Sequence, residues 1–290
     1  MATDLAARLP DARGRRRRRD WAQATVISIG LGLILFVTFV PVLLMLFMSV
    51  RSRGQILTSL WSLPNPVLWT NYVRGWQGIE PFIVNSILYC TAAIIPIVLF
   101  TSLTGFAMGT MRIPGKEVLF YAILALMMIP GILTLFPRMS LIYQFNLVNT
   151  PWALVLPWAA GGQVLGVFLM RTAFEGVHIE IREAAYVDGA THFQQYAQVC
   201  LPLVWPMAVT LAIMSFVALY NDLVWPLIVM QERAKQVVAV GLLDFTAYVG
   251  TSDLGLQMAG YAIASLPLLL VFLFGMRYYI AGISSGAVKM

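Results

Sequence analysis

Charged residues are scarce in this chain. Only 11% of its 290 residues are Asp, Glu, Lys or Arg, whereas 60% are hydrophobic and the mean hydropathy is +0.81. A soluble domain carries about a quarter charged residues, so this chain lacks the polar surface that a water-exposed fold needs. The composition excludes an ordinary soluble enzyme and the disordered and fibrous classes, and it indicates a single helical membrane domain.

Cysteine and histidine are also sparse, with two residues of each. Cys90 lies inside an apolar run and Cys200 lies beside a predicted cytoplasmic loop, so we expect no disulfide between them. There is no CxxC or Cys/His cluster to support metal binding. His178 and His192 have no partners arranged as a triad, and we interpret both as surface residues. The sequence therefore predicts no catalytic residue and no metal ligand.

A phosphate-binding loop is missing as well. Gly115-Lys116 is followed by Glu117, where a phosphate loop would have Ser or Thr. If the protein works with ATP, another chain must bind it.

Long apolar runs, in contrast, are abundant. Six are long enough to cross a bilayer, which takes about 20 residues. They cover approximately residues 21–50, 82–111, 118–136, 152–170, 203–230 and 258–280. The first is too long for a signal-peptide core and no small-residue cleavage site follows it, so we interpret it as an uncleaved anchor. We expect an all-α integral membrane protein with six transmembrane helices, in a domain over residues 21–281.

Positive charge is concentrated near the N-terminus, at Arg13 and Arg15–Arg19. Beside a spanning segment such residues act as a cytoplasmic retention signal. Nucleic-acid binding is disfavoured because no aromatic or folded module accompanies them. With the N-terminus inside, most of the 19 Lys and Arg residues fall on cytoplasmic segments. We therefore expect both termini in the cytoplasm, as a basic tail over residues 1–20 and a short tail over residues 282–290.

One long cytoplasmic connection is expected, over residues 171–201. Its pattern predicts a short helix, a break at Gly189, a second helix and a stop at Leu201-Pro202. Glu183 would be favoured near a helix N-terminus by the macrodipole. An apolar stripe for docking is formed by Phe193, Tyr196 and Val199. The alternative is an amphipathic helix lying on the membrane surface.

This loop resembles the EAA loop of ABC importer permeases. The resemblance rests on Glu183-Ala184-Ala185, on Gly189 after three intervening residues, and on Val-x-Leu-Pro ending at Pro202. Four further segments are similar to the carbohydrate-importer subgroup: Asn85-Ser86, Phe168–Arg171, Asn221-Asp222 and Trp225–Leu227. The C-terminal segment Gly282–Lys289 is similar to the tail of maltose-type permeases. The chain departs from the family's usual residues at Tyr220, often Trp, and at Met290, often Gly.

The resemblance implies a type I ABC importer permease fold that forms half of a heterodimeric channel. The implied partners are a second homologous permease, two ATP-binding-cassette ATPases that bind ATP and Mg, and an extracytoplasmic sugar-binding protein, in a bacterial or archaeal cell membrane. The loop over residues 175–202, which we call the coupling loop, would dock on the ATPases. Its implied coupling residues are Glu183, Ala184, Ala185, Asp188, Gly189, Leu201 and Pro202. This chain itself would hold no cofactor and would not be an enzyme.

Asp222 is an ionisable residue inside a predicted span, which makes it a functional candidate by default. With Asn221 it could line a sugar path, because hydroxyls favour amide and carboxylate partners, and Tyr220 and Met214 could add contact surface. Equally, Asp222 could hold the fifth helix against a neighbour or reach the outer interface.

The function expected is transport of a sugar or oligosaccharide across the lipid membrane by alternating access, driven by closure of the ATPases. A permease for glycerol-phosphate esters would need Lys or Arg in its cavity, and none lies clearly within a span. A proton-coupled secondary transporter would need several intramembrane acids, and a membrane-embedded enzyme would need paired carboxylates or a nucleophile with its base. Asp222 stands alone.

Overall fold

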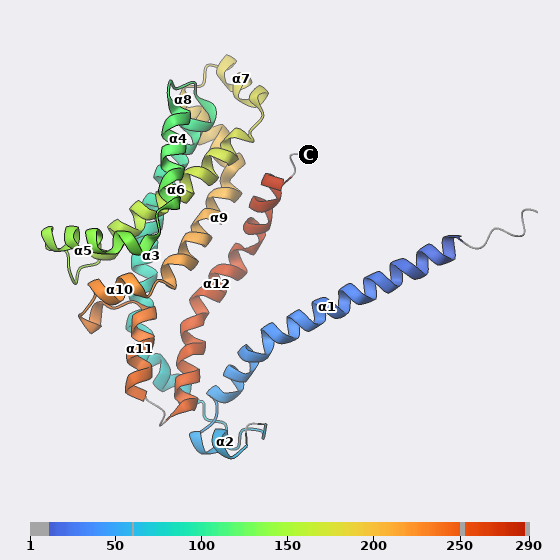
Figure 1. Cartoon of the computed structure of the whole chain (residues 1–290), viewed down its shortest axis with the longest axis vertical. Helices are drawn as coiled ribbons and strands as arrows, with labels where there is room; N and C mark the ends of the chain where they lie inside the picture. Colours follow the sequence, from blue (N-terminus) through green and yellow to red (C-terminus); the bar gives the residue numbers. More distant parts are fainter. Residues whose placement is uncertain (1–11, 60, 250–252, 288–290) are drawn as a thin grey trace, which may run out of the picture.

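A computed structural model describes residues 12–59, 61–249 and 253–287, and in these ranges the chain is helical without any strand (Figure 1). The long helices are α1 (Ala12–Ser49), α3 (Thr70–Thr110), α6 (Trp152–Glu175), α9 (Leu201–Tyr220) and α12 (Leu254–Ala287). The short elements are α2 (Arg53–Thr58), α4 (Lys116–Ala125), η2 (Leu126–Met128), η3 (Gly131–Thr134), α5 (Leu135–Gln144), α7 (Ile179–Val187), α8 (His192–Gln194), η4 (Gln195–Cys200), α10 (Val224–Val229), η5 (Arg233–Lys235) and α11 (Val238–Val249).

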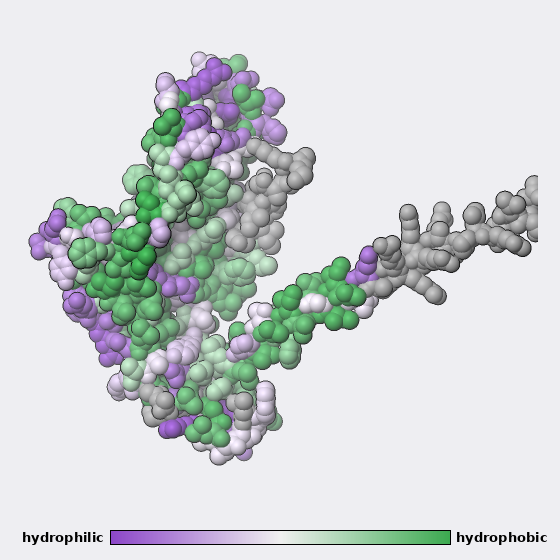
Figure 2. Space-filling view, viewed as in Figure 1, coloured by the Kyte–Doolittle hydropathy of each residue, from purple (hydrophilic) through white to green (hydrophobic). Residues whose placement is uncertain are grey.

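Five stretches are long and apolar enough to cross a membrane. They are Gln23–Ser49, Thr70–Thr110, Trp152–Glu175, His192–Tyr220 and Leu254–Tyr278. Figure 2 shows hydrophobic side chains over much of the bundle and the coloured part of α1, with hydrophilic ones at the end that carries α7 and α8 and along the side that carries α5 and α10. The all-α membrane fold predicted from the sequence is confirmed. Residues 1–11 and 288–290 of the two predicted tails lie outside the described ranges.

The predicted third span is not a straight helix. It is a pair of helices, Lys116–Met128 and Gly131–Gln144, bent by 93°. The bend falls at Ile129-Pro130, where Ile129 has an extended backbone (ψ 115°), because a residue before proline avoids the helical region. Counted as one crossing, the pair brings the number of spans to six.

Close packing of α3 on α6 shows that these two helices run parallel. A Cβ on Gly105 would lie 2.6 Å from the Met170 Cβ, and a Cβ on Gly162 would overlap Ile97. Along both helices the contacting positions advance in the same direction, with Gly109 against Phe174 and Gly166 against Thr101. Parallel neighbours require the chain to return between them, and the bent pair makes this return. Gly105 and Gly109 form one GxxxG spacing and Gly162 and Gly166 form another, and both allow α3 and α6 to pack closely.

The fifth span differs from its predicted range at both ends. The predicted stop at Leu201-Pro202 is wrong, because the helix runs on from His192 to Tyr220. The Leu201 amide bonds the Tyr196 carbonyl, five residues back, so η4 is a π-helix and Pro202 occupies the first turn of α9, where proline is tolerated. The predicted continuation to Met230 is also wrong, since α9 ends at Tyr220 and α10 is separate.

Candidate functional site

The coupling loop projects from one end of the bundle, where Figure 1 places α7 and α8. α7 ends in a turn that requires glycine. Gly189 has φ +81°, its amide bonds the Tyr186 carbonyl, and the Ala190 amide bonds the Ala185 carbonyl at 2.9 Å. This is the Schellman pattern, in which a left-handed residue closes a helix C-terminus. The predicted break at Gly189 is present, and its cause is this backbone geometry.

Thr191 begins the next helix. Its hydroxyl accepts the Gln194 amide, and the Gln194 side chain accepts the Thr191 amide at 2.8 Å. This reciprocal capping box satisfies two amides at the helix start. The direction of the chain between α7 and α8 is therefore set by local hydrogen bonds.

The surface of α7 is exposed and partly apolar. Glu183, Ala184, Asp188 and Gly189 are exposed, and Ala185 is half-buried. Glu183 is the fifth residue of α7, whereas the acid in the first turn is Glu180, so the expected helix-start position of Glu183 is wrong. Large exposed hydrophobic side chains in and beside α7 are Ile179, Ile181, Tyr186, Val187 and Phe193. An apolar surface of this kind, rimmed by polar residues, marks an interaction site.

The second half of the coupling loop is packed into the bundle. Tyr196 is buried among Phe106 of α3 and Phe174 of α6, with ring centroids 5.4 and 6.2 Å away. The expected docking stripe is thus divided, because Tyr196 points inward whereas Phe193 is 70% exposed. Leu201 is half-buried and Pro202 is exposed at the start of α9.

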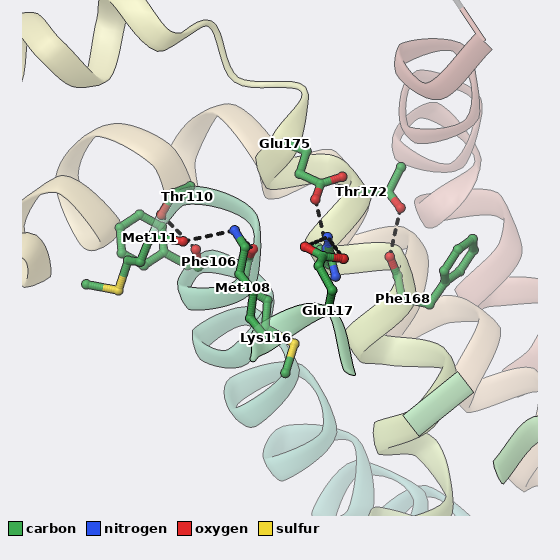
Figure 3. A network of polar contacts seen from close by, with 10 residues as sticks. Phe106, Met108, Thr110, Met111, Lys116, Glu117, Phe168, Thr172 and Glu175 are labelled. Carbon is green, nitrogen blue, oxygen red and sulfur yellow. Dashed lines mark hydrogen bonds and ion pairs between the residues drawn. The ribbon is translucent and has the colours of Figure 1, made fainter. Parts of the chain in front are cut away.

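A buried arginine links α4 to α6 directly before the loop. Arg171 donates from Nε to Glu175 at 2.8 Å and from Nη2 to both Glu117 oxygens at 2.7 and 2.9 Å. Its guanidinium lies 3.9 Å from the centre of the Phe120 ring. Figure 3 shows the carboxylates of Glu117 and Glu175 pointing toward one another. Sequence reasoning assigned Arg171 no partner, because Glu117 is 54 positions away.

The residues predicted for a substrate path do not gather on one lining. Tyr220 is buried and donates its hydroxyl to the Ala264 carbonyl at 2.8 Å. Asn221 is exposed and bonds the Val217 carbonyl of its own helix. Met214 is 38% exposed, and a separation of six residues puts it on a different face of α9 from Tyr220.

Asp222 has protein partners on both carboxylate oxygens. Oδ2 accepts the indole N–H of Trp158 at 2.8 Å, and Oδ1 accepts the Trp225 amide at 3.4 Å. Asp222 thus bonds the first turn of α10 and ties it to α6, to which Trp225 adds a bond from its indole to the Ala153 carbonyl. These bonds match the interpretation in which Asp222 holds its helix against a neighbour.

Away from the coupling loop, three side chains hold the loop between α10 and α11. Asn85 donates to the Ala234 and Gln236 carbonyls at 2.9 and 3.0 Å, and Ser86 accepts the Val238 amide at 2.7 Å. Asn149 accepts two more amides, those of Gln231 and Glu232. Asn85-Ser86 resembles a family segment, and the sequence alone predicts no role for it.

The described residues contain no group of three His, Cys, Asp or Glu side chains suited to a metal.

A family model described as a binding-protein-dependent transport system inner membrane component matches residues 101–285. The chain is 29% identical over 280 residues to the probable ABC transporter permease protein YurM of Bacillus subtilis, covering 96% of this chain and 93% of YurM. It is 27% identical to the diacetylchitobiose uptake system permease protein NgcG of Streptomyces coelicolor, over 87% of this chain and 85% of NgcG.

A third relative is the arabinooligosaccharides transport system permease protein AraQ of Halalkalibacterium halodurans, 26% identical over 94% of this chain and 99% of AraQ. Among solved structures, a bacterial ABC transporter involved in the import of the acidic polysaccharide alginate contains a similar chain. The TM-score is 0.78 at 19% identity, over 90% of this chain and 98% of that one. This likeness establishes the fold.

Proposed function

Because the chain belongs to the family of binding-protein-dependent transport system inner membrane components, we propose that it is the permease subunit of an ATP-driven importer for a sugar or oligosaccharide. Alternating access of the helical bundle would carry the substrate across the membrane. The energy would come from separate ATPase subunits, which bind ATP and Mg, and the chain itself forms no covalent intermediate.

The observation that carries this proposal is the exposed α7 surface. Tyr186 and Val187 are 71% and 84% exposed at the polar end of the bundle, beside Glu183. Exposing such side chains to water is unfavourable by about 25 cal/mol per Å², which a cleft on a partner protein would remove. We propose that the cleft belongs to an ATPase, that each of two ATPases receives one such loop, and that the second loop comes from a homologous permease.

A carbohydrate is proposed as the substrate on two grounds. The printed names of NgcG and AraQ specify diacetylchitobiose and arabinooligosaccharides. In addition, two grooves beside α3, one against α9 and α12 and one against α6, are lined without Lys or Arg. A glycerol-phosphate ester would call for such cations, because phosphate is recognised by charge-assisted hydrogen bonds.

The remaining partners and the orientation complete the proposal. An extracytoplasmic binding protein would deliver the sugar, and the loop between α10 and α11 offers it a charged, firmly bonded surface, with Lys235 paired to Glu232 at 2.6 Å. Both termini would lie in the cytoplasm with the coupling loop. Thiol labelling of single cysteines introduced at Thr191 and Gln231 would test this. Impermeant reagent should reach Gln231→Cys in intact cells and Thr191→Cys only after lysis.

Copurification tests the assembly. The tagged chain, extracted from its native membrane, should bring down an ATPase and a second permease. Glu183→Ala should remove the ATPase while the second permease stays. His178→Ala is the matched control, an exposed change just outside α7. Recovery of the chain alone, under conditions that preserve other such complexes, would refute the proposal.

Uptake tests the substrate class. A strain lacking the chain should lose uptake of one labelled oligosaccharide from a panel and regain it with the wild-type gene. Uptake of labelled glycerol 3-phosphate should be unaffected. Loss of glycerol 3-phosphate uptake with normal sugar uptake would favour the alternative substrate, and uptake that persists without any ATPase would indicate a secondary transporter.

A further inference from the structure

The coupling loop is joined covalently to α6 and α9, yet two of its side chains bond to α3. The first is Arg182 of α7, whose Nη1 donates to the carbonyl of Thr110 at 3.0 Å. Thr110 is the last residue of α3. The final carbonyls of a helix have no partner within it, and a cation there also interacts favourably with the helix dipole. Arg182 therefore binds α7 to the end of α3.

A second cation completes this cap. Lys116 donates from Nζ to the carbonyls of Met108 and Met111 at 2.8 and 2.9 Å (Figure 3). Lys116 comes from α4, whereas Arg182 comes from the coupling loop, 72 residues beyond Thr110. The end of α3 is thus held from two directions, and only one of them involves the loop.

The other bond between the loop and α3 is buried. The Tyr196 hydroxyl and the Ser102 hydroxyl lie 2.7 Å apart, with both residues inside the bundle. Ser102 and Thr110 are separated by eight residues of α3, about 12 Å along its axis. Two bonds at that spacing, together with the packing of the Tyr196 ring against Phe106, oppose rotation of the loop relative to α3 as well as its separation from it.

We propose that Arg182 and Tyr196 are positioning residues that clamp the coupling loop to α3, so that a displacement of the loop moves this end of α3 with it. The inference rests on the proposed function, in which an ATPase displaces the loop. α3 is suited to pass the movement on because it contacts α6, α9, α11 and α12. The clamp would thus transmit movement of the coupling loop to the bundle through α3, in addition to the covalent connections to α6 and α9.

Distance measurements between two spin labels test the clamp. The labels are placed at exposed positions, Arg112→Cys just after α3 and His192→Cys at the start of α8, while the native Cys90 and Cys200 are buried. In the wild-type complex the distance should be narrowly distributed. It should also be the same without nucleotide as after trapping with ATP and vanadate, because the loop and the end of α3 move together.

Removing either bond should loosen this relationship. Ser102→Ala and Tyr196→Phe each delete one hydroxyl, and each should broaden the distribution at least twofold. The double variant should be no broader than either single one, because both remove the same bond. Arg182→Gln should broaden it as well, whereas Arg182→Lys, which keeps a cationic donor, should restore most of the narrow distribution. Tyr121→Phe, at an exposed tyrosine of α4, is the control.

Two results would overturn the clamp. One is a wild-type distance that changes between the nucleotide-free and trapped states. The other is a set of variants with distributions as narrow as the wild type. The width without nucleotide is also measured on the permease alone, so the clamp is tested even if no ATPase copurifies, which would refute the proposed function separately.

Discussion

Trp158 donates its indole N–H to Asp222 at 2.8 Å, which ties α6 to the break between α9 and α10. The same carboxylate accepts the Trp225 amide. With these two bonds, the Asp222 carboxylate helps to hold the segment between α9 and α10 against α6. These bonds favour the interpretation in which Asp222 holds its helix against a neighbour, and its place in a sugar path stays a prediction.

Asp222→Ala should lower the stability of the purified protein. The substitution leaves the Trp158 and Trp225 N–H groups without their acceptor, at about 1–3 kcal/mol for each buried donor. A thiol-reactive dye reports unfolding directly, because both native cysteines are buried. Asn221→Ala is the adjacent control, since that side chain bonds only its own helix. A normal melting temperature combined with a raised KM for sugar would instead place Asp222 in the substrate path.

Gly189→Ala should weaken binding of the ATPase. An L-residue at φ +81° is strained by about 1–2 kcal/mol, and the α7 turn would relax away from its docking orientation. Gly115→Ala provides a matched control, because Gly115 has φ +74° at the start of α4, outside the coupling loop, and neither glycine has atoms near an added Cβ. Copurification should fall for Gly189→Ala alone. Equal losses for both variants would show that strain anywhere in the chain is sufficient.

Gly105→Ala should disrupt the contact between α3 and α6. The new Cβ would lie 2.7 Å from the backbone carbon of Met170, which cannot rotate away as a flexible side chain could. Overpacking of this kind costs about 1–3 kcal/mol. Gly161→Ala adds the same methyl group to α6 in open space and should not lower the melting temperature, because alanine is the better helix former. If the two variants melt alike, the helices are less closely packed than the structure shows.

Arg171→Gln should destabilise the protein more than either Glu117→Gln or Glu175→Gln. The Arg171 side chain is only 9% exposed, whereas the two carboxylates are 50% and 40% exposed and can be solvated when unpaired. The arginine variant also loses the contact with the Phe120 ring. Melting temperatures of the three variants give the ranking. A carboxylate variant that melts below Arg171→Gln would contradict it.

Much of the fold follows from hydropathy, because a lipid-exposed helix must be apolar along its whole length. Breaks inside an apolar run are harder to predict. The bend at Pro130 and the end of α9 at Tyr220 both lie where the apolar pattern continues on either side. Hydropathy predicts that these residues are removed from water, but it does not predict where a helix bends or ends.

The break at Gly189 in the coupling loop was predictable because its signals are local. Gly189 ends the helix because its own backbone is left-handed, and the hydrogen bonds of the turn join residues that are three to five positions apart. The residues predicted for a substrate path, in contrast, bond to partners that are distant in sequence. Asp222 meets Trp158 across 64 positions, and Tyr220 meets Ala264 across 44. A single sequence does not show such pairings, so Tyr220 was proposed as a sugar contact although its hydroxyl is already bonded.

α3 is bonded to two different loops: Asn85 and Ser86, near its middle, hold the segment before α11, and Ser102 and Thr110, towards its C-terminal end, hold the coupling loop. Free-energy coupling between two binding sites is reciprocal. If α3 transmits the state of one loop to the other, a ligand that favours one position of the loop between α10 and α11 must change the nucleotide affinity of an ATPase docked on the coupling loop. Nucleotide must then change the affinity for that ligand by the same factor.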